Sequence, residues 1–243
     1  MHIIKLNAID STNSFLKRIS NDGPLEDMTV VVADYQTDGR GQMGTQWVSK
    51  DSNNLLFSVF KKITGLDVDA AFSVAIVVAL SVFNTLVKLQ LMNVRIKWPN
   101  DILSGNKKLA GILIENVVKQ NRVQASVIGI GININQVHFE DLPNASSLIL
   151  ETGRLFDRDE VLQMVLLELQ AYFQVLESGK SSYLKQLYEA NLFRKDKPST
   201  FTDAGGTKFS GFIRGITESG NLKIEIEDAQ IKEYDLKSVS LLY

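Results

Sequence analysis

Residues 94–133 decide the fold, and they read VRIKWPNDILSGNKKLAGILIENVVKQNRVQASVIGIGIN. Three runs of β-branched and apolar residues in it are typical of strands, and they lie at 94–98, 108–118 and 123–130. Turn-forming residues separate these runs, at 99–101, 104–106 and 120–121. Such short connections favour antiparallel neighbours, because a parallel pair needs a long crossover. The stretch therefore predicts a mixed, largely antiparallel sheet within an α+β fold.

Two more predicted strands flank a glycine-rich loop upstream of this stretch. Residues 29–35 and 54–60 are rich in β-branched and apolar side chains, and Gly39-Arg40-Gly41-Gln42-Met43-Gly44 between them is too rich in glycine for a regular element. Backbone N–H groups of such a loop can surround an anion, while Arg40 adds a fixed planar charge. A long hairpin is the commoner explanation of a bare glycine-rich loop. The loop lacks the Walker and Rossmann patterns, so a nucleotide would bind in a different mode.

Three helices are expected beside the sheet. Capping residues at 10–13 precede apolar positions at helical spacing, so one helix should begin there. Residues 70–91 form the most apolar stretch, yet polar residues interrupt it and leave far fewer than the roughly 20 apolar residues that span a bilayer. This stretch indicates a buried helix and no membrane contact. Residues 160–177 place apolar side chains on one face, with Asp157 or Asp159 as the cap, and predict an amphipathic helix.

The pattern changes near residue 195 to short alternating strands. They are expected at 207–214, 222–226 and 230–234, with turns of Gly, Ser, Asn and Asp between them. Strands of this length and spacing predict a small C-terminal β-barrel. The chain is therefore expected to hold two domains, 1–192 and 193–243.

Composition argues against several kinds of site and partner. The formal net charge is −2, which gives no diffuse basic field for non-specific nucleic-acid binding, so DNA is not an expected partner. The chain has no cysteine, which excludes disulfides, thiolate metal sites and a cysteine nucleophile. Its two histidines make a Ser-His-Asp site improbable. The first residues lack the charged and apolar regions of a signal peptide, so export is not expected and a cytoplasmic location fits.

Five segments occur in the order and spacing of the signature segments of biotin protein ligases. They are Ser11-Thr12-Asn13, the loop from Gln36 through Gly39-Arg40-Gly41 to Trp47, Lys97-Trp98-Pro99-Asn100-Asp101, Lys108-Leu109-Ala110-Gly111-Ile112-Leu113-Ile114-Glu115 and Gly129-Ile130-Gly131-Ile132-Asn133. On these segments the chain resembles that family up to about Leu192. The resemblance implies a class II synthetase-like catalytic domain, and the C-terminal strands resemble the family's SH3-like barrel more loosely. Because Ser11 opens the first segment, a short form without the N-terminal DNA-binding domain is expected.

The resemblance implies a two-step reaction. The biotin carboxylate attacks the α-phosphate of ATP to give biotinyl-5'-AMP, and a lysine of a biotin carboxyl carrier domain then attacks this acyl adenylate. No covalent enzyme intermediate is needed, so the site must supply positioning and charge stabilisation. ATP, Mg²⁺ and biotin are the expected ligands, and the carrier domain of a biotin-dependent carboxylase is the expected partner. Family members often form homodimers through sheet edges, and no periodic seam in the sequence decides this for the chain.

The same resemblance gives the expected site residues. Lys108 and Arg40 are the catalytic residues, with Lys108 beside the reacting carboxylate and α-phosphate. Biotin contacts are expected from polar, glycine and apolar residues, namely Ser11, Thr12, Asn13, Gln36, Gly39, Arg40, Gly111, Ile112, Leu113, Gly129 and Gly131. ATP or adenylate contacts are expected from Arg40, Gly41, Gln42, Trp47, Asn100, Lys108 and Asn133. Asp101 is the residue expected to hold Mg²⁺ through water.

Each of these segments also has a plain structural explanation. Lys108 could be a solvated lysine at a strand start, and Trp47 could be a core aromatic beneath the loop. Ser11 and Thr12 could form an N-cap, and the residues after Pro99 could form an ordinary turn. Unrelated turns and caps would not occur in the order and spacing of one family. The five segments taken together therefore favour the functional explanation over the structural one.

Gln42 departs from the family pattern. Many members carry a second arginine there, whose charge helps to retain the adenylate, and glutamine keeps hydrogen bonding while losing that charge. We therefore expect this chain to release the adenylate faster.

Other functions remain open from the sequence. A lipoate or octanoate protein ligase shares the catalytic fold and also acylates a carrier lysine, but Trp47 and residues 97–101 favour biotin. A biotin-sensing repressor and a catalytically silent binding module are the remaining alternatives. The early position of Ser11 argues against the first, and the presence of both Arg40 and Lys108 argues against the second.

Overall fold

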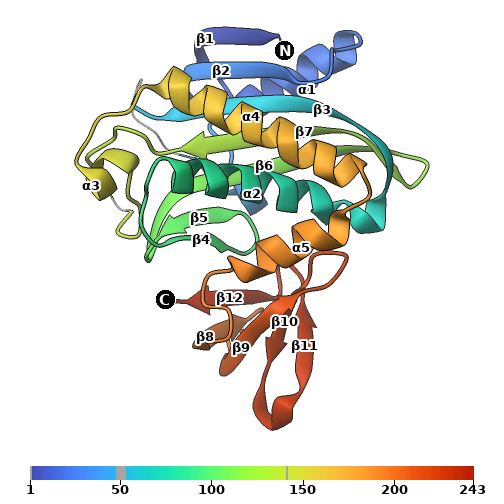
Figure 1. Cartoon of the computed structure of the whole chain (residues 1–243), viewed down its shortest axis with the longest axis vertical. Helices are drawn as coiled ribbons and strands as arrows, with labels where there is room; N and C mark the ends of the chain where they lie inside the picture. The colour runs from blue at the N-terminus through green and yellow to red at the C-terminus, as the bar shows by residue number, and fades with distance from the viewer. Residues whose placement is uncertain (1, 48–52, 141) are drawn as a thin grey trace.

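The computed structural model of the chain describes residues 2–47, 53–140 and 142–243. It contains two sheets, with helices packed on the larger one (Figure 1). In spatial order the seven-stranded sheet consists of β1 (Ile3–Ile9), β2 (Thr29–Gln36), β3 (Leu55–Asp67), β7 (Arg122–Ile132), β6 (Lys107–Lys119), β5 (Asp101–Ser104) and β4 (Val94–Lys97). The five-stranded sheet consists of β11 (Ile231–Tyr234), β10 (Leu222–Glu225), β9 (Lys208–Ile216), β8 (Pro198–Asp203) and β12 (Val239–Leu242). The helices are α1 (Thr12–Asp22), α2 (Phe72–Lys88), α3 (Leu148–Thr152), α4 (Arg158–Glu177) and α5 (Ser181–Ala190), with short 3-10 turns η1 (Gln42–Gly44), η2 (Val68–Ala70) and η3 (Glu227–Ala229).

The large sheet confirms the predicted mixed, largely antiparallel arrangement. All five predicted strands are present in it, and every neighbouring pair is antiparallel except β1 with β2. Two strands were not predicted, β1 and β5. The four residues of β5 lie between two turns, and they separate β4 from β6, which the turn pattern had made direct neighbours. The strand β1 pairs in parallel because α1 carries the chain back along the sheet before β2 begins.

Helices cover both faces of the large sheet. Strand residues alternate between faces, so Val31 and Val127 point toward α1 and pack with Leu16. Their neighbours Val32 and Ile128 belong to the larger core on the opposite face, with α2 and α4. The large sheet is therefore the middle of three layers.

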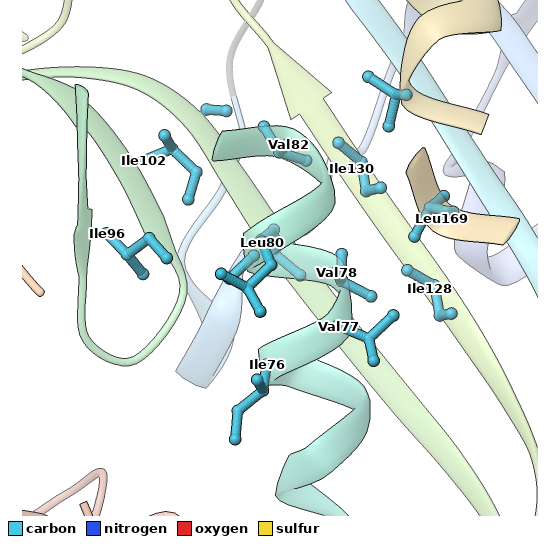
Figure 2. Close-up of a cluster of buried hydrophobic side chains, with 14 of the residues drawn as sticks. Ile76, Val77, Val78, Leu80, Val82, Ile96, Ile102, Ile128, Ile130 and Leu169 are labelled. Carbon is cyan, nitrogen blue, oxygen red and sulfur yellow. The ribbon is translucent and has the colours of Figure 1, made fainter. Parts of the chain in front are cut away.

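The apolar helix α2 lies at the centre of the larger core. Figure 2 shows Val77 and Val78 of α2 in one cluster with Ile128 of β7 and Leu169 of α4. The segment Val68–Lys88 is long and apolar enough to cross a membrane by length and composition, and 56% of its most apolar window is buried inside the protein. Its apolar composition is accounted for by this burial. The predicted buried helix is confirmed.

The C-terminal strands form an open sheet. Its edge strands are β11 and β12, which do not pair with each other in the described residues, so the predicted closed barrel is not confirmed. Two of its strands, β8 and β12, were not predicted, and β12 has only four residues. The sheet packs below α5 and the β4–β5 end of the large sheet (Figure 1). The indole Nε1 of Trp98 donates to the Gly220 carbonyl at 2.9 Å and joins the two parts.

Candidate active site

A cavity of about 570 Å³ lies where several separate segments of the catalytic region meet. It is lined by the start of α1, the end of β2, the glycine-rich loop, the start of β3, the β4–β5 turn, the first half of β6 and the end of β7. Sixteen of the residues expected at the site lie in its wall, namely Ser11, Thr12, Asn13, Gln36, Arg40, Gly41, Gln42, Trp47, Asn100, Asp101, Lys108, Gly111, Ile112, Leu113, Gly129 and Gly131. Segments more than a hundred residues apart in sequence therefore build one site.

The two remaining expected residues lie beside this wall. Gly39 supports the glycine-rich loop, because its carbonyl accepts from the Trp47 backbone N–H at 2.9 Å and a Cβ at this position would lie 2.3 Å from the Trp47 oxygen. Asn133 lines an adjoining cavity of about 290 Å³ that also touches Trp47 and Lys108. Its side-chain amide donates to the Ser146 carbonyl at 2.9 Å, which fixes its orientation.

Hydroxyl and amide groups gather at one end of the main cavity. The backbone N–H and Oγ1 of Thr12 lie 2.8 and 3.1 Å from Oε1 of Gln36. Ser11 occupies the N-cap position of α1, yet its side chain makes no capping hydrogen bond. The N-cap explanation therefore does not account for the Ser11 hydroxyl, which lines the cavity.

Three residues that were not expected at the site hold this polar end. Ser58 Oγ is fully buried and lies 2.6 Å from Oδ1 of Asn13 and 2.7 Å from Oγ1 of Thr12. The Asn13 amide donates to Glu115 at 3.0 Å, and Lys17 pairs with the same carboxylate at 2.8 Å. Burial alone would raise the pKa of Glu115, but the hydrogen bonds from Lys17 and Asn13 outweigh it and lower the pKa. Glu115 therefore stays ionised and keeps Asn13 in place.

Charged side chains occupy the opposite end. Lys108 Nζ lies 2.7 Å from Oδ1 of Asp101, and Lys97 Nζ lies 3.5 Å from Oδ2 of the same carboxylate. Lys108 is therefore a paired cation in a cavity wall, and 34% of its side chain stays exposed. Oδ1 of Asp101 is buried, and among the described residues its charged neighbour is Lys108 alone. This oxygen can accept from a further donor, such as a bound water.

The indole of Trp47 lies on a floor made by two glycines. A Cβ at Gly111 or Gly131 would come within 2.7 or 2.6 Å of the indole ring, so only glycine admits the ring this close to the sheet. Lys108 Nζ lies 5.4 Å from the centre of the Trp47 ring, within cation–π range. Gly111 and Gly131 were expected to contact biotin, and in the structure the Trp47 indole lies against both of them.

Arg40 lies on the exposed part of the glycine-rich loop and reaches the cavity wall. The loop turns back on itself, because the Gly41 N–H donates to the Thr45 carbonyl at 2.6 Å and Arg40 pairs with Gln46 in a β-bridge. The site thus combines one buried polar end, one charged end and an apolar floor. Such an arrangement suits an elongated ligand with a polar head and an acid group that meets a phosphate.

Comparison with known proteins agrees with this geometry. Residues 6–133 match the biotin/lipoate A/B protein ligase family. The bifunctional ligase/repressor BirA of Escherichia coli (strain K12) is 33% identical over 97% of this chain and 73% of its own length. The biotin–acetyl-CoA-carboxylase ligase of Mycobacterium tuberculosis is 29% identical, over 89% of this chain and 80% of its own length.

Solved structures show the same likeness. The biotin protein ligase from Aquifex aeolicus in complex with biotin and ATP has a TM-score of 0.81 and 29% identity, covering 99% of this chain and 98% of that one. Its fold is shared along the whole chain, including the C-terminal sheet. The family match spans more than half of the sequence, and together with these relatives it shows that the chain belongs to the biotin/lipoate A/B protein ligase family.

Proposed function

We propose that the chain is a biotin protein ligase, which activates biotin with ATP to biotinyl-5'-AMP and transfers it to a lysine of a biotin carboxyl carrier domain. The observation that carries this proposal is the single cavity whose wall contains Ser11, Thr12 and Gln36 together with the cations Arg40 and Lys108. The chain is also about 30% identical to such ligases over nearly its whole length, and this similarity supports the same activity.

Biotin occupies the end held by α1 and β2 in this proposal. The ureido group needs donors and acceptors in fixed positions, and Ser11, Thr12 and Gln36 supply them. The apolar ring system lies against Ile112 and Leu113 of β6, beside the Trp47 indole that covers Gly111 and Gly131. The side-chain oxygen and amide of Asn13 already bind Ser58 and Glu115. Asn13 therefore supports the cavity wall and does not bind biotin directly.

ATP occupies the charged end. Arg40, Gly41 and Gln42 face the phosphates, Trp47 and Asn133 face the adenine, and Asn100 lines the wall between them. The Asn100 amide already donates to the Ile112 carbonyl at 2.9 Å, so its role is to fix that wall. Stacking on an indole contributes about 1–3 kcal/mol per base in other proteins.

Mg²⁺ fits this end only as a partner of the nucleotide. The described residues contain no cluster of three His, Asp or Glu side chains that could hold a metal ion by themselves. Oδ1 of Asp101 is engaged by Lys108 alone among the described residues, and its remaining lone pair can accept from a water of a hydrated ion. When bound, Mg²⁺ would neutralise phosphate charge beside Lys108.

Two steps complete the reaction. A carboxylate oxygen of biotin forms a bond to the α-phosphorus and pyrophosphate leaves, while Lys108 stabilises the negative charge on the α-phosphate. The carrier lysine nitrogen then bonds to the acyl carbon, AMP leaves, and the amine loses its proton. Holding both reactants in one cavity removes most of the entropic cost of bringing them together.

The remaining features follow from this activity. We assign the catalytic domain to residues 1–192 and an SH3-like domain, here an open sheet, to residues 193–243. A cytoplasmic location matches the supply of ATP and carrier protein. The second half of β6 extends beyond the short β5 and leaves an unpaired sheet edge in the described residues, which suits a homodimer or a docked carrier domain.

The deciding experiment incubates the protein with MgATP, biotin and a carrier domain, and then weighs the carrier by mass spectrometry. We expect the carrier to gain one biotinyl group. Lipoate and octanoate, offered in place of biotin, test the related ligases of the same fold. Transfer of either acid with none of biotin would contradict the proposal.

A further inference from the structure

The C-terminal sheet reaches both cavities of the site. Ser240 of β12 lines the main cavity, and Tyr243, just after β12, lines the adjoining cavity with Trp47, Lys108 and Asn133. No motif in the sequence pointed to either residue. The reaction site is therefore built from both parts of the chain.

Tyr243 makes two contacts that fix its ring. Lys97 Nζ lies 5.1 Å from the centre of the ring, and the ring of Phe193 meets it edge to face at 5.2 Å. Burial and the Asp101 carboxylate raise the pKa of Tyr243, so its hydroxyl stays neutral at physiological pH. The ring thus acts as an uncharged platform beside a lysine.

Lys97 links this platform to the reacting end. Its ammonium lies 3.5 Å from Asp101, whose other oxygen lies 2.7 Å from Lys108. The chain of contacts runs from Tyr243 through Lys97 and Asp101 to Lys108. If the Lys97 ammonium moved away from Asp101, Lys108 would be the remaining cation on that carboxylate, and their pairing would change.

We propose that Tyr243 is a positioning residue for the nucleotide half of the site, holding Lys97 against Asp101 and closing the adenine cavity. This inference rests on the proposed ligase function. The substrate affected is the nucleotide, because Tyr243 lines the cavity with Trp47 and Asn133 and does not line the main cavity at its polar end.

Three variants test the inference. Tyr243→Leu removes the ring face, Tyr243→Phe keeps the ring and removes the hydroxyl, and Tyr234→Leu is the matched control. Tyr234 belongs to the same sheet and stacks on Phe209 at 5.6 Å, outside the lining of both cavities. Pyrophosphate release at varied ATP and varied biotin gives separate KM values, and calorimetry gives the Kd for ATP. Thermal unfolding reports whether each variant is folded.

We expect Tyr243→Leu to raise the KM and Kd for ATP about five- to tenfold, as the loss of one cation–π contact and part of a cavity wall would. The KM for biotin should change less than twofold, Tyr243→Phe should restore ATP binding, and Tyr234→Leu should leave both substrates unaffected. An equal rise in both KM values, or equal ATP binding by Tyr243→Leu and Tyr234→Leu, would overturn the inference. Wild-type protein that releases no pyrophosphate with biotin and ATP would instead overturn the proposed function.

Discussion

One carboxylate sets the charge balance at the phosphate end of the cavity. Asp101 is mostly buried and holds Lys97 and Lys108 on its two oxygens. Without a nucleotide the two cations thus share one anion, and a net positive charge remains in the wall. An incoming phosphate supplies further negative charge, so Lys108 does not have to give up Asp101 to stabilise the reacting group.

Replacement of Lys108 by alanine removes this stabilisation. We expect Lys108→Ala to lower the rate of adenylate formation by about 10²–10³-fold, the loss found when one stabilising donor is removed from a reacting charge. Pyrophosphate release in single-turnover experiments measures it. Lys119→Ala, at the exposed far end of β6, is the matched control and should keep the wild-type rate. A normal rate for Lys108→Ala would take Lys108 out of the mechanism.

Gln42 is one of the residues that we propose to face the phosphates. It borders the main cavity and a smaller one that reaches the C-terminal sheet. We expect Gln42→Arg to slow adenylate dissociation about tenfold, since hydrogen bonds to charged groups contribute roughly 1.5–3 kcal/mol. Dissociation of labelled biotinyl-5'-AMP measures the rate. Thr37→Arg, which adds the same charge at an exposed position outside the cavity lining, controls for general attraction. An unchanged rate for Gln42→Arg would refute a role for charge at this position.

Sequence reasoning identified the residues that face the cavity and missed the residues that hold them. The five motifs pointed to Ser11, Gln36 and Lys108, and all three line the cavity. Ser58 lies within an apolar run of β3 and supports Asn13 of α1, 45 residues away. A buried polar residue in a strand is a signal worth testing, but its partner is set only by the packing of β3 on α1.

At the scale of elements, β6 and β7 form the floor of the site. Long apolar runs with short turns predicted these strands, because their pattern and turns are local features of the sequence. The short strands β5 and β12 were missed, since four residues carry too little periodicity and their pairing depends on distant neighbours. The barrel was predicted in place of an open sheet for the same reason. Local turns do not show whether the two edge strands of a sheet pair with each other.

Gly129 tests the close packing of this floor against α1. A Cβ at Gly129 would lie 2.4 Å from Oδ1 of Asn13, which Ser58 holds in place. We expect Gly129→Ala to weaken biotin binding by about 1–3 kcal/mol, a typical cost of overpacking. Calorimetric titration with biotin measures this loss. Gly23→Ala, where no atom lies within 4 Å of the added carbon, should bind biotin normally. Equal biotin affinity of both variants would show that α1 moves to admit the added methyl group without loss of binding.

At the scale of the molecule, the C-terminal sheet is fastened to the catalytic sheet from several sides. Ile96 of β4 exchanges backbone hydrogen bonds with Asn191 and Phe193, next to the start of the C-terminal sheet. The Ile216 N–H donates to the Glu189 carboxylate of α5 at 2.9 Å. These contacts span the boundary expected near residue 192, so we expect the two parts to unfold together.

Trp98 is the side chain whose removal tests this coupling. Trp98→Phe keeps an aromatic ring in the core but leaves the buried Gly220 carbonyl without its donor, which costs about 1–3 kcal/mol. We expect urea unfolding, followed by far-UV circular dichroism, to stay a single transition with a free energy of unfolding lowered by this amount. Tyr183→Phe, at a half-exposed position on α5, should leave the free energy of unfolding unchanged.

Ser240 and Tyr243 reach the two cavities from the C-terminal sheet, which Trp98 joins to the catalytic sheet. ATP binding by Trp98→Phe should therefore weaken while the protein is still folded. Two separate transitions in the wild-type protein would show that the C-terminal sheet is stable by itself, and the coupling argued from Trp98 would then be wrong.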